Sequence, residues 1–221
     1  MSTQKLYGYL RGIRGILITE LDQDGSYLTG PDNSYWIDTA QQAEVTAEVV
    51  AGETADLRGG DRLLLRLEED DVIVGVNLTF RDARFDAEAT EIIAGGTLIT
   101  ADSIQAAAFG ERVEVGDVIG WIAPTIEEQA TRTPFQADVY VQSFDEYGGR
   151  EAYMVYSFTY CRGRMPETSH SDRGWGTPEF EVKARQNSGL QLSTYQKLFV
   201  PSDALDALPN TPPVKVDLSS E

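Results

Sequence analysis

Residues 61–96 constrain the fold more than any other part of the chain. Apolar side chains occupy alternate positions in two consecutive runs, first Leu63, Leu65 and Leu67, and then Val72, Val74, Val76, Leu78 and Phe80. A period of two is typical of half-buried β-strands. The acidic residues Glu69, Asp70 and Asp71 separate the two runs and are predicted to form a turn. The segment therefore predicts a two-stranded ribbon.

One short helix is predicted directly after this ribbon. Asp86 is of a residue type that caps helix N-termini, and Gly95 is of the type that ends helices. Four apolar residues share one helical face, namely Phe85, Ala89, Ile92 and Ile93. The pattern indicates a helix laid on a β-rich subunit.

Most of the remaining chain also has strand-like patterns. Strands are predicted at residues 13–21, 35–50, 135–144, 151–161 and 178–185, whereas residues 97–133 have no clear pattern. We therefore predict an all-β fold, a barrel or sandwich of two packed sheets with one short flanking helix, as a single domain over residues 1–221. The Gly-rich residues 51–60 are predicted to be a loop or projecting arm, and the Pro-rich residues 201–221 a flexible arm.

The composition favours a folded protein in a reducing compartment. Of 221 residues, 41% are hydrophobic and 10% aromatic, which is enough for a substantial core. No apolar run reaches the roughly 18 residues that a membrane span needs, and the N-terminus lacks the apolar stretch of a signal peptide. The single cysteine, Cys161, excludes an internal disulfide framework. We expect a cytoplasmic chain that does not enter membranes.

The charge balance is strongly acidic. Lys and Arg number 18 against 36 Asp and Glu, for a net charge of −18. Such a chain lacks the basic footprint that holds nucleic acid. Three explanations remain open: solubility, adaptation to a saline cytoplasm, or the passage of DNA that must not adhere.

Several motifs that resemble chemical sites are better explained as surface turns and loops. Residues 22–25 resemble the start of a calcium loop but lack its closing Glu and flanking helices. Four acids at residues 68–71 are typical of a solvated turn. His170 lies in a predicted exposed loop, and with Cys161 it supplies too few ligands for zinc. We predict no catalytic residue, no metal, no cofactor and no enzymatic activity.

Two parts of the chain resemble a known family. Residues 43–96 show a strand, a polar arm, two further strands ending in Leu78-Thr79-Phe80 and a short helix closed by glycines. Residues 135–189 contain YMVYSFTYCRG followed by TPEFEVKARQNSG. Both resemble the major tail (tail tube) proteins of long, non-contractile-tailed viruses, although Thr159-Tyr160-Cys161 stands where that family more often has Phe-Pro-Cys.

The resemblance implies a structural virion protein of the virus tail, assembled in the host cytoplasm. Six copies would form a ring, and stacked rings would form a tube that conducts DNA. The implied partners are other copies, the tape measure, terminator and distal tail proteins, and passing double-stranded DNA that is not bound specifically. The implied channel-lining residues are Glu44, Thr46, Glu48, Arg62, Arg66, Glu68, Gln136, Asp138, Gln142, Ser157 and Thr159, and the implied inter-ring arm residues are Gly52, Glu53, Asp56, Arg58, Gly59 and Gly60.

The strand pleat adds an expectation about side-chain direction. If Leu63, Leu65 and Leu67 and the apolar residues of 135–141 face the core, then Glu44, Glu48, Glu68 and Asp138 face the opposite side. Arg62 and Arg66 share that side and are expected to pair with acids. The channel wall would then carry a net negative potential.

Two other functions remain open from the sequence. A ligand-binding β-sandwich, such as a carbohydrate-recognition module, would use Trp36, Trp121 and Trp175 as a platform, although these residues are also typical of cores and subunit interfaces. A related ring-forming tail component, such as a tail terminator or a contractile-tail inner tube, fits the same patterns. Assembly state separates the tail components from the sugar-binding module.

Overall fold

The computed structural model describes residues 9–28, 33–59, 62–102, 113–144, 147–168, 172, 176–185 and 196–201. The main element of the fold is one antiparallel sheet with strand order β2-β1-β9-β10-β11-β6-β3, to which β12 is added beside β10. The strands of this sheet are β1 (Tyr9–Glu20), β2 (Ser34–Ile37), β3 (Ala40–Val50), β6 (Val72–Asp82), β9 (Phe135–Phe144), β10 (Arg150–Gly163), β11 (Glu179–Arg185) and β12 (Gln196–Pro201).

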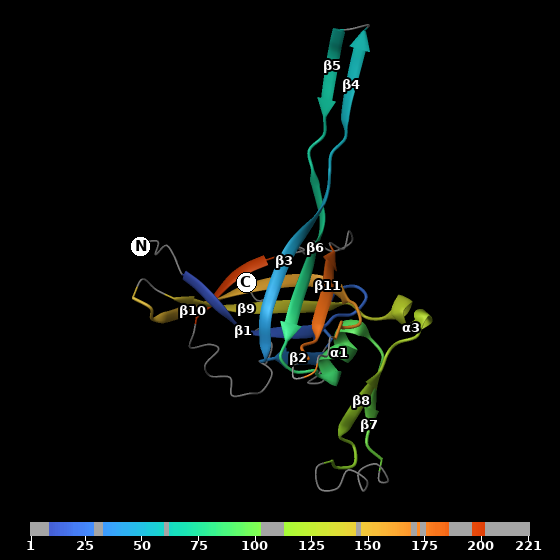
Figure 1. The fold of residues 1–221 in the computed structure, drawn as a ribbon, viewed down its shortest axis with the longest axis vertical. Coiled ribbons are helices and arrows are strands. Elements are labelled where there is room, and N and C mark those ends of the chain that lie inside the picture. Colours follow the sequence, from blue (N-terminus) through green and yellow to red (C-terminus); the bar gives the residue numbers. More distant parts are fainter. Residues whose placement is uncertain are drawn as a thin grey trace.

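The sheet folds over on itself at β10. This strand pairs with β9 up to Cys161 and with β11 from Cys161 to Gly163, and its register shifts between Phe158 and Cys161. Tyr160, inside the shift, has a φ of 53°. A bulge of this kind bends a strand and increases its twist. In Figure 1, β1, β9 and β10 consequently run across the view while β3, β6 and β11 run along its long axis.

The core lies between these two halves of the sheet. Side chains from both halves are almost completely buried, including Ile16, Ile18, Leu78, Phe80, Phe135, Phe158, Phe180 and Val182. Phe80 and Phe180 stack with ring centroids 5.0 Å apart. Full burial of one such side chain contributes about 1.5–3 kcal/mol. The predicted all-β fold with a short helix is confirmed, and its two packed layers are halves of one continuous sheet.

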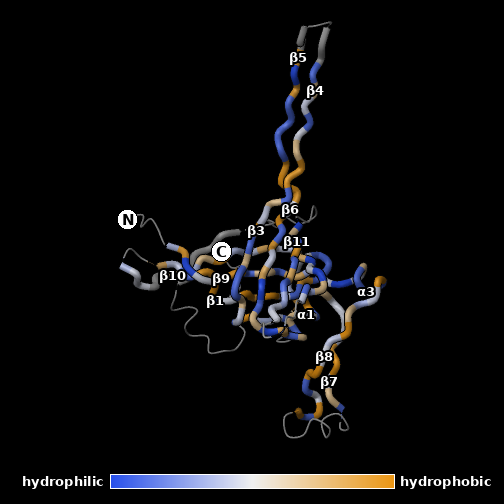
Figure 2. Tube along the Cα trace, in the orientation of Figure 1, coloured by the Kyte–Doolittle hydropathy of each residue, from blue (hydrophilic) through white to orange (hydrophobic). Residues whose placement is uncertain are grey.

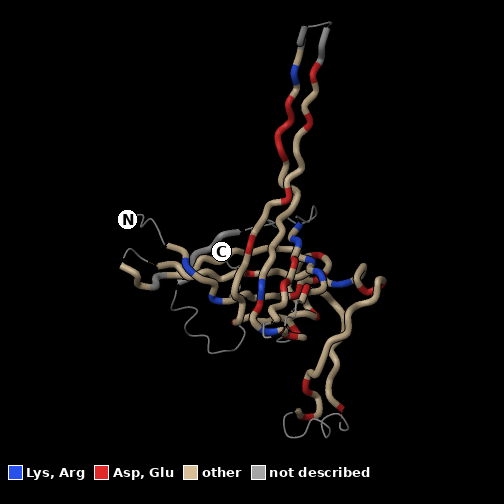
Figure 3. Tube along the Cα trace, in the orientation of Figure 1, with Lys and Arg blue, Asp and Glu red and all other residues tan. Residues whose placement is uncertain are grey.

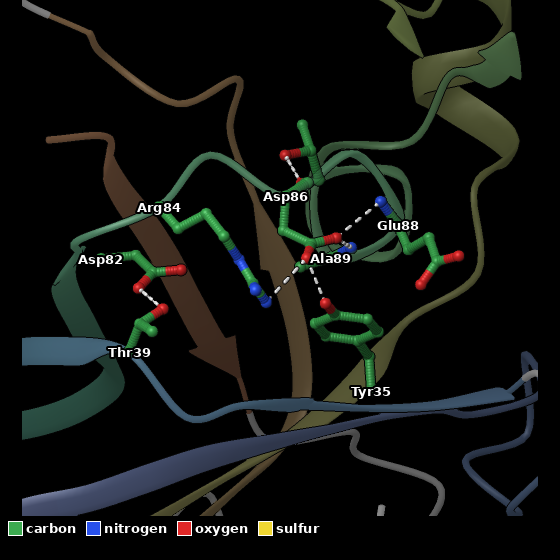
Figure 4. Close-up of polar contacts among 8 residues, drawn as sticks. Tyr35, Thr39, Asp82, Arg84, Asp86, Glu88 and Ala89 are labelled. Atoms are coloured by element: carbon green, nitrogen blue, oxygen red, sulfur yellow. Dashed lines mark hydrogen bonds and ion pairs between the residues drawn. The ribbon is translucent and has the colours of Figure 1, made fainter. Parts of the chain in front are cut away.

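The predicted helix is confirmed as α1 (Ala87–Ala94). The Asp86 carboxylate accepts hydrogen bonds from the backbone N–H groups of Glu88 and Ala89, and it also accepts from the Tyr35 hydroxyl and pairs with Arg84 (Figure 4). Burial, followed by the contact with Asp86, raises the pKa of Tyr35. This cap ties the helix to β2.

Close packing holds α1 against β10. Ala89 and Ile93 are buried, whereas Phe85 lies outside the helix and is 48% exposed. A Cβ atom built on Gly163 would lie 2.2 Å from Cγ2 of Ile93 and 2.8 Å from its carbonyl oxygen. Only glycine at this position lets the helix approach so closely.

Two hairpins leave the body of the subunit in different directions (Figure 1). The longer pairs β4 (Thr54–Gly59) with β5 (Arg62–Glu68), and the shorter pairs β7 (Thr97–Thr100) with β8 (Val118–Ile122). A second short helix, α3 (Ile126–Thr131), starts with a capping box between Thr125 and Glu128. The sequence patterns did not predict β7, β8 or α3, which lie within residues 97–133, where no clear pattern was found.

The structure corrects two other predictions about elements. Residues 35–50 form two strands, β2 and β3, rather than one. The predicted ribbon is also wrong, because β5 pairs with β4 and β6 pairs with β3. Glu69, Asp70 and Asp71 therefore connect two strands that follow one another, and residues 60–61, which separate β4 from β5 in the sequence, lie outside the described residues. The tail after β12, residues 202–221, also lies outside them, so its predicted flexibility stays a prediction.

Candidate assembly surfaces

The longer hairpin is one continuous extension of the main sheet, which we call the arm (residues 51–71). The chain rises from β3 into β4 and returns from β5 into β6 (Figure 1). Two hydrogen bonds hold its base: the Glu69 N–H donates to the Glu53 carbonyl at 3.1 Å, and the Gly52 N–H donates to Oδ1 of Asp71 at 2.9 Å. A Cβ on Gly52 would lie 1.9 Å from the Glu69 carbonyl oxygen. The glycine therefore sets the spacing of the two strands.

The arm and the strands that carry it expose apolar side chains. Hydrophobic residues along this part of the trace are orange in Figure 2. Leu65 is 60% exposed, Leu67 57% and Ile73 65%, and the same end of the sheet exposes Val45, Val49, Val50, Val72 and Val74. Apart from one another, β4 and β5 make no substantial contact with a described element. Contiguous exposed apolar surface of this kind marks interaction sites.

The arm is also acidic, as Figure 3 shows by its red segments. Its exposed carboxylates are Glu53, Asp56, Glu68, Glu69, Asp70 and Asp71. Asp56 lies 3.9 Å from Arg66 across the hairpin. Of the predicted arm residues, Gly52, Glu53 and Asp56 lie in the arm, Arg58 and Gly59 end β4 with side-chain positions outside the described set, and Gly60 lies outside the described residues.

The position of β5 removes the premise behind part of the predicted channel wall. Leu65 and Leu67 do not face the core, so alternation gives no reason to place Arg66 and Glu68 on a channel side, and their role in a channel stays a prediction. Both residues belong to the arm, as does the backbone of Arg62, whose side chain lies outside the described set. The alternation signals a strand here, but its apolar side is exposed.

Three other predicted wall residues are buried within the subunit. Asp138 is 9% exposed, Ser157 5% and Thr159 6%. All three point away from the main core, as the pleat predicted for Asp138, but Leu17, Tyr153 and Val155 on the same side are buried too. These side chains are therefore covered in the single subunit, and that they line a channel stays a prediction. Gln136 and Gln142 are half-buried in β9.

A chain of hydrogen bonds satisfies the buried carboxyl group. The Tyr27 hydroxyl donates to Oε1 of Gln136 at 2.7 Å, and Nε2 of Gln136 donates to both oxygens of Asp138 at 2.9 and 3.0 Å. Burial raises the pKa of Asp138, and its hydrogen bonds with Ser157 and Gln136 offset part of that rise. Burial likewise raises the pKa of the Cys161 thiol.

The remaining predicted wall residues lie on the outer face of β3. Glu44 and Thr46 are exposed and Glu48 is half-buried. Across the neighbouring strands, Glu48 pairs with Arg185 at 3.3 Å, Glu179 with Arg81 at 2.6 Å and Glu181 with Arg164 at 3.0 Å. This face, built by β3, β6 and β11, carries charges of both signs rather than a uniformly negative surface.

The outer face leads into a basic pocket that the sequence patterns did not reveal. Its volume is about 390 Å³, and it is lined by Arg132, Arg162, Arg164, Lys183 and Arg185, with Tyr160 and Gly163. Arg162 and Lys183 are directly opposite one another on β10 and β11. A signal was present in the sequence, because two short segments of a strongly acidic chain, Arg162-Gly163-Arg164 and Lys183-Ala184-Arg185, each carry two cations.

The sheet also has a long free edge. Among the described residues, β3 pairs with β6 on one side and no strand pairs with its other side. β3 extends over Ala40–Val50, so this edge presents a row of backbone N–H and C=O groups. Unprotected edges of this kind template pairing with another chain.

Other candidate sites are not assembled by the described residues. Trp36 packs edge-on against Tyr140, and Nε1 of Trp121 donates to the Gly95 carbonyl at 2.9 Å, so these two tryptophans serve packing on separate elements. Trp175 and His170 lie outside the described residues. No group of three His, Cys, Asp or Glu side chains within the described ranges is placed to hold a metal ion. In the same ranges, no helix is long and apolar enough to cross a membrane.

Comparisons with known proteins give distant structural likenesses. No family model and no curated protein matches the chain. Among solved structures, the chain is similar to the tube-terminating cap of the anti-feeding prophage (TM-score 0.31, 8% identity, 90% of this chain and 100% of that chain). It is similar to a chain of the sheath-tube complex of an extracellular contractile injection system, PVC, in its extended state (TM-score 0.31, 9% identity, 90% of this chain and 99% of that chain). A chain of the anti-feeding prophage baseplate is similar as well (TM-score 0.32, 13% identity, 90% of this chain and 97% of that chain). These likenesses are to cap, sheath-tube and baseplate assemblies, not specifically to the tubes of long non-contractile tails.

Proposed function

We propose that this protein is a structural subunit of a virus tail or tail-like particle, and that copies of it form rings that stack into a tube. The observation that carries the proposal is the arm. This element projects from the body, exposes Leu65 and Leu67 and makes no substantial contact with the other described elements of its own subunit, so its apolar side chains are left uncovered in a monomer. Its apolar side chains gain free energy only when another chain covers them.

The free edge of β3 supports the same function. A ring satisfies the edge strands of its subunits through copies of the same chain. We further propose that each ring contains six copies. We also propose the role that the resemblance to tail tube proteins implies, a siphovirus-type tail tube that conducts DNA without binding it specifically. In that role the protein is not an enzyme, and its partners are its own copies and the other tail proteins. Its place is the virion tail, assembled in the host cytoplasm.

A related ring-forming part, such as a tail terminator or a contractile-tail inner tube, is the second candidate. The chain is similar to a tube-terminating cap and to a chain of the sheath-tube complex of a contractile injection system. Polymer length separates a terminator from a tube protein of either kind, because a tube protein forms long stacks whereas a terminator forms single rings.

Removing the arm tests the proposal. Glu53 and Glu69 are already hydrogen-bonded across the base of the arm, so a two-residue Asn-Gly turn can replace residues 54–68 without moving them. We expect this variant to keep its far-ultraviolet circular dichroism and melting temperature but to form no tubes in negative-stain images. As a control, Asp56→Ala with Arg66→Ala removes an exposed ion pair of the arm, which is worth little, and tubes should persist.

Two results would contradict the proposal. One is that the native chain sediments as a compact monomer at every salt and protein concentration tried. The other is that the arm-less variant builds tubes of native length, which would place the stacking contacts elsewhere.

A further inference from the structure

The basic pocket is difficult to explain in an isolated subunit. Arg162 and Lys183 are cross-strand partners, and like charges in that position destabilise a sheet. Among the described residues neither has a carboxylate within ion-pairing distance, whereas Arg164 and Arg185 are each paired with one Glu. Several cations are thus held together in a chain whose net charge is −18.

Arg132 adds a further cation from a different element. It follows α3, and its Nη1 donates to the Ala94 carbonyl at the end of α1, at 3.1 Å. Its Nε is buried with no hydrogen-bond partner among the described residues. Burial, and next the neighbouring Arg162, lower the pKa of the Arg132 guanidinium. Cations gathered from β10, β11 and the end of α3 therefore favour an anion in the pocket.

The arm offers the matching anions. Glu68, Glu69 and Asp70 are exposed, and within the described part of the chain none of them has a cationic partner. The arm of the same subunit cannot deliver them, because it extends away from its own sheet, as Figures 1 and 3 show. A second copy can.

We propose that the basic pocket of one subunit receives the carboxylates at the base of the arm of a second copy, chiefly Glu69 and Asp70. This inference rests on the proposed function and names the acceptor of the arm. Apolar residues of the arm supply the buried area, and the carboxylates fix its orientation, because complementary charges set register and exclude wrong partners. Stacking of rings is then sensitive to salt, since exposed charges are screened over about 10 Å at 0.1 M.

Reciprocal charge reversal tests the contact. Arg162→Glu with Lys183→Glu reverses the pocket, and Glu69→Lys with Asp70→Lys reverses the arm. These arm changes leave the Asp71 side chain and the Glu69 N–H, which hold the base of the arm, unaltered. Each pair alone is expected to lower the fraction of protein in stacked assemblies by about ten-fold or more, as measured by sedimentation and negative-stain images. The four changes together should restore stacking.

Controls separate this contact from general charge effects. Arg11→Glu with Arg14→Glu changes the net charge as much as the pocket variant does, at exposed positions of β1, and should leave stacking unchanged. The inference is overturned if the combined variant fails to regain stacking, or if the pocket variant stacks like the native chain. It is also overturned if the pocket variant stacks normally but loses binding of a fluorescent duplex DNA, which would identify a phosphate site. A native chain that never assembles refutes the proposed function itself, whereas stacking that ignores both reversals refutes only this contact.

Discussion

Replacing Gly52 with Ala is expected to misdirect the arm without unfolding the subunit. The new Cβ would lie 1.9 Å from the Glu69 carbonyl oxygen. Because an unstrained contact needs about 3.4 Å, the strands must separate by roughly 1.5 Å on that side. Neighbouring strands are about 4.8 Å apart, so this opening rotates the arm by roughly 17°. Over the seven residues 53–59, at about 3.3 Å each, the tip moves by roughly 7 Å.

A displacement of that size is larger than a side-chain contact tolerates, so Gly52→Ala should shorten or abolish tubes. The assay is the length distribution of tubes in negative-stain images, with the melting temperature as a check on folding. Gly120→Ala is the matched control, because its Cβ meets only the flexible end of the Ile99 side chain, at 3.3 Å. Native-length tubes from Gly52→Ala, in native yield, would refute the reasoning that the base of the arm sets its direction.

Three further outcomes are expected. Gly163→Ala should lower the free energy of unfolding by about 1–3 kcal/mol in urea titrations. The double variant with Ile93→Ala should lose less stability than the sum of the two single losses, because the new methyl group fills space that Ile93 leaves. Additivity of the two losses within about 0.5 kcal/mol would contradict this expectation. Burial raises the folded-state pKa of Asp138, so the contribution of this group to stability is complete below its unfolded-state pKa and is lost as pH rises through the folded-state pKa. Asp138→Asn should flatten this decline in melting temperature, and an unchanged pH profile would exclude Asp138 as its source. Glu44→Lys with Thr46→Lys should leave tubes assembled but slow DNA ejection from particles, since phosphate would then bind the wall, and normal ejection would show that β3 does not line the channel.

Local signals in the sequence predicted the elements whose shape depends on local chemistry. Asp86 and Gly95 marked both ends of α1. The alternating run of residues 135–144 gave the bounds of β9. Caps and pleats act within a few residues, so their effects can be recognised without knowing the rest of the fold.

The failures arose where a distant partner decides the outcome. The leucines of β5 alternate as in a core strand, but whether an apolar side faces its own core or another chain is not encoded in the alternation. Asp138 points to the side that the pleat predicts, yet that side is covered. The basic pocket was missed because residues from β10, β11 and the end of α3 meet only in the folded chain.

The strand order also dictates when the subunit can fold during synthesis. Glu20 of β1 pairs with Phe135 of β9, and Phe80 of β6 pairs with Phe180 of β11. Contacts so far apart in the chain make folding slow, because most of the polypeptide must leave the ribosome before the sheet can close. The hairpin of β4 and β5 joins neighbouring segments and can form long before that. A nascent chain therefore exposes the apolar side chains of the arm before the main sheet has formed. Host chaperones that cover exposed apolar strands should then raise the yield of correctly assembled particles.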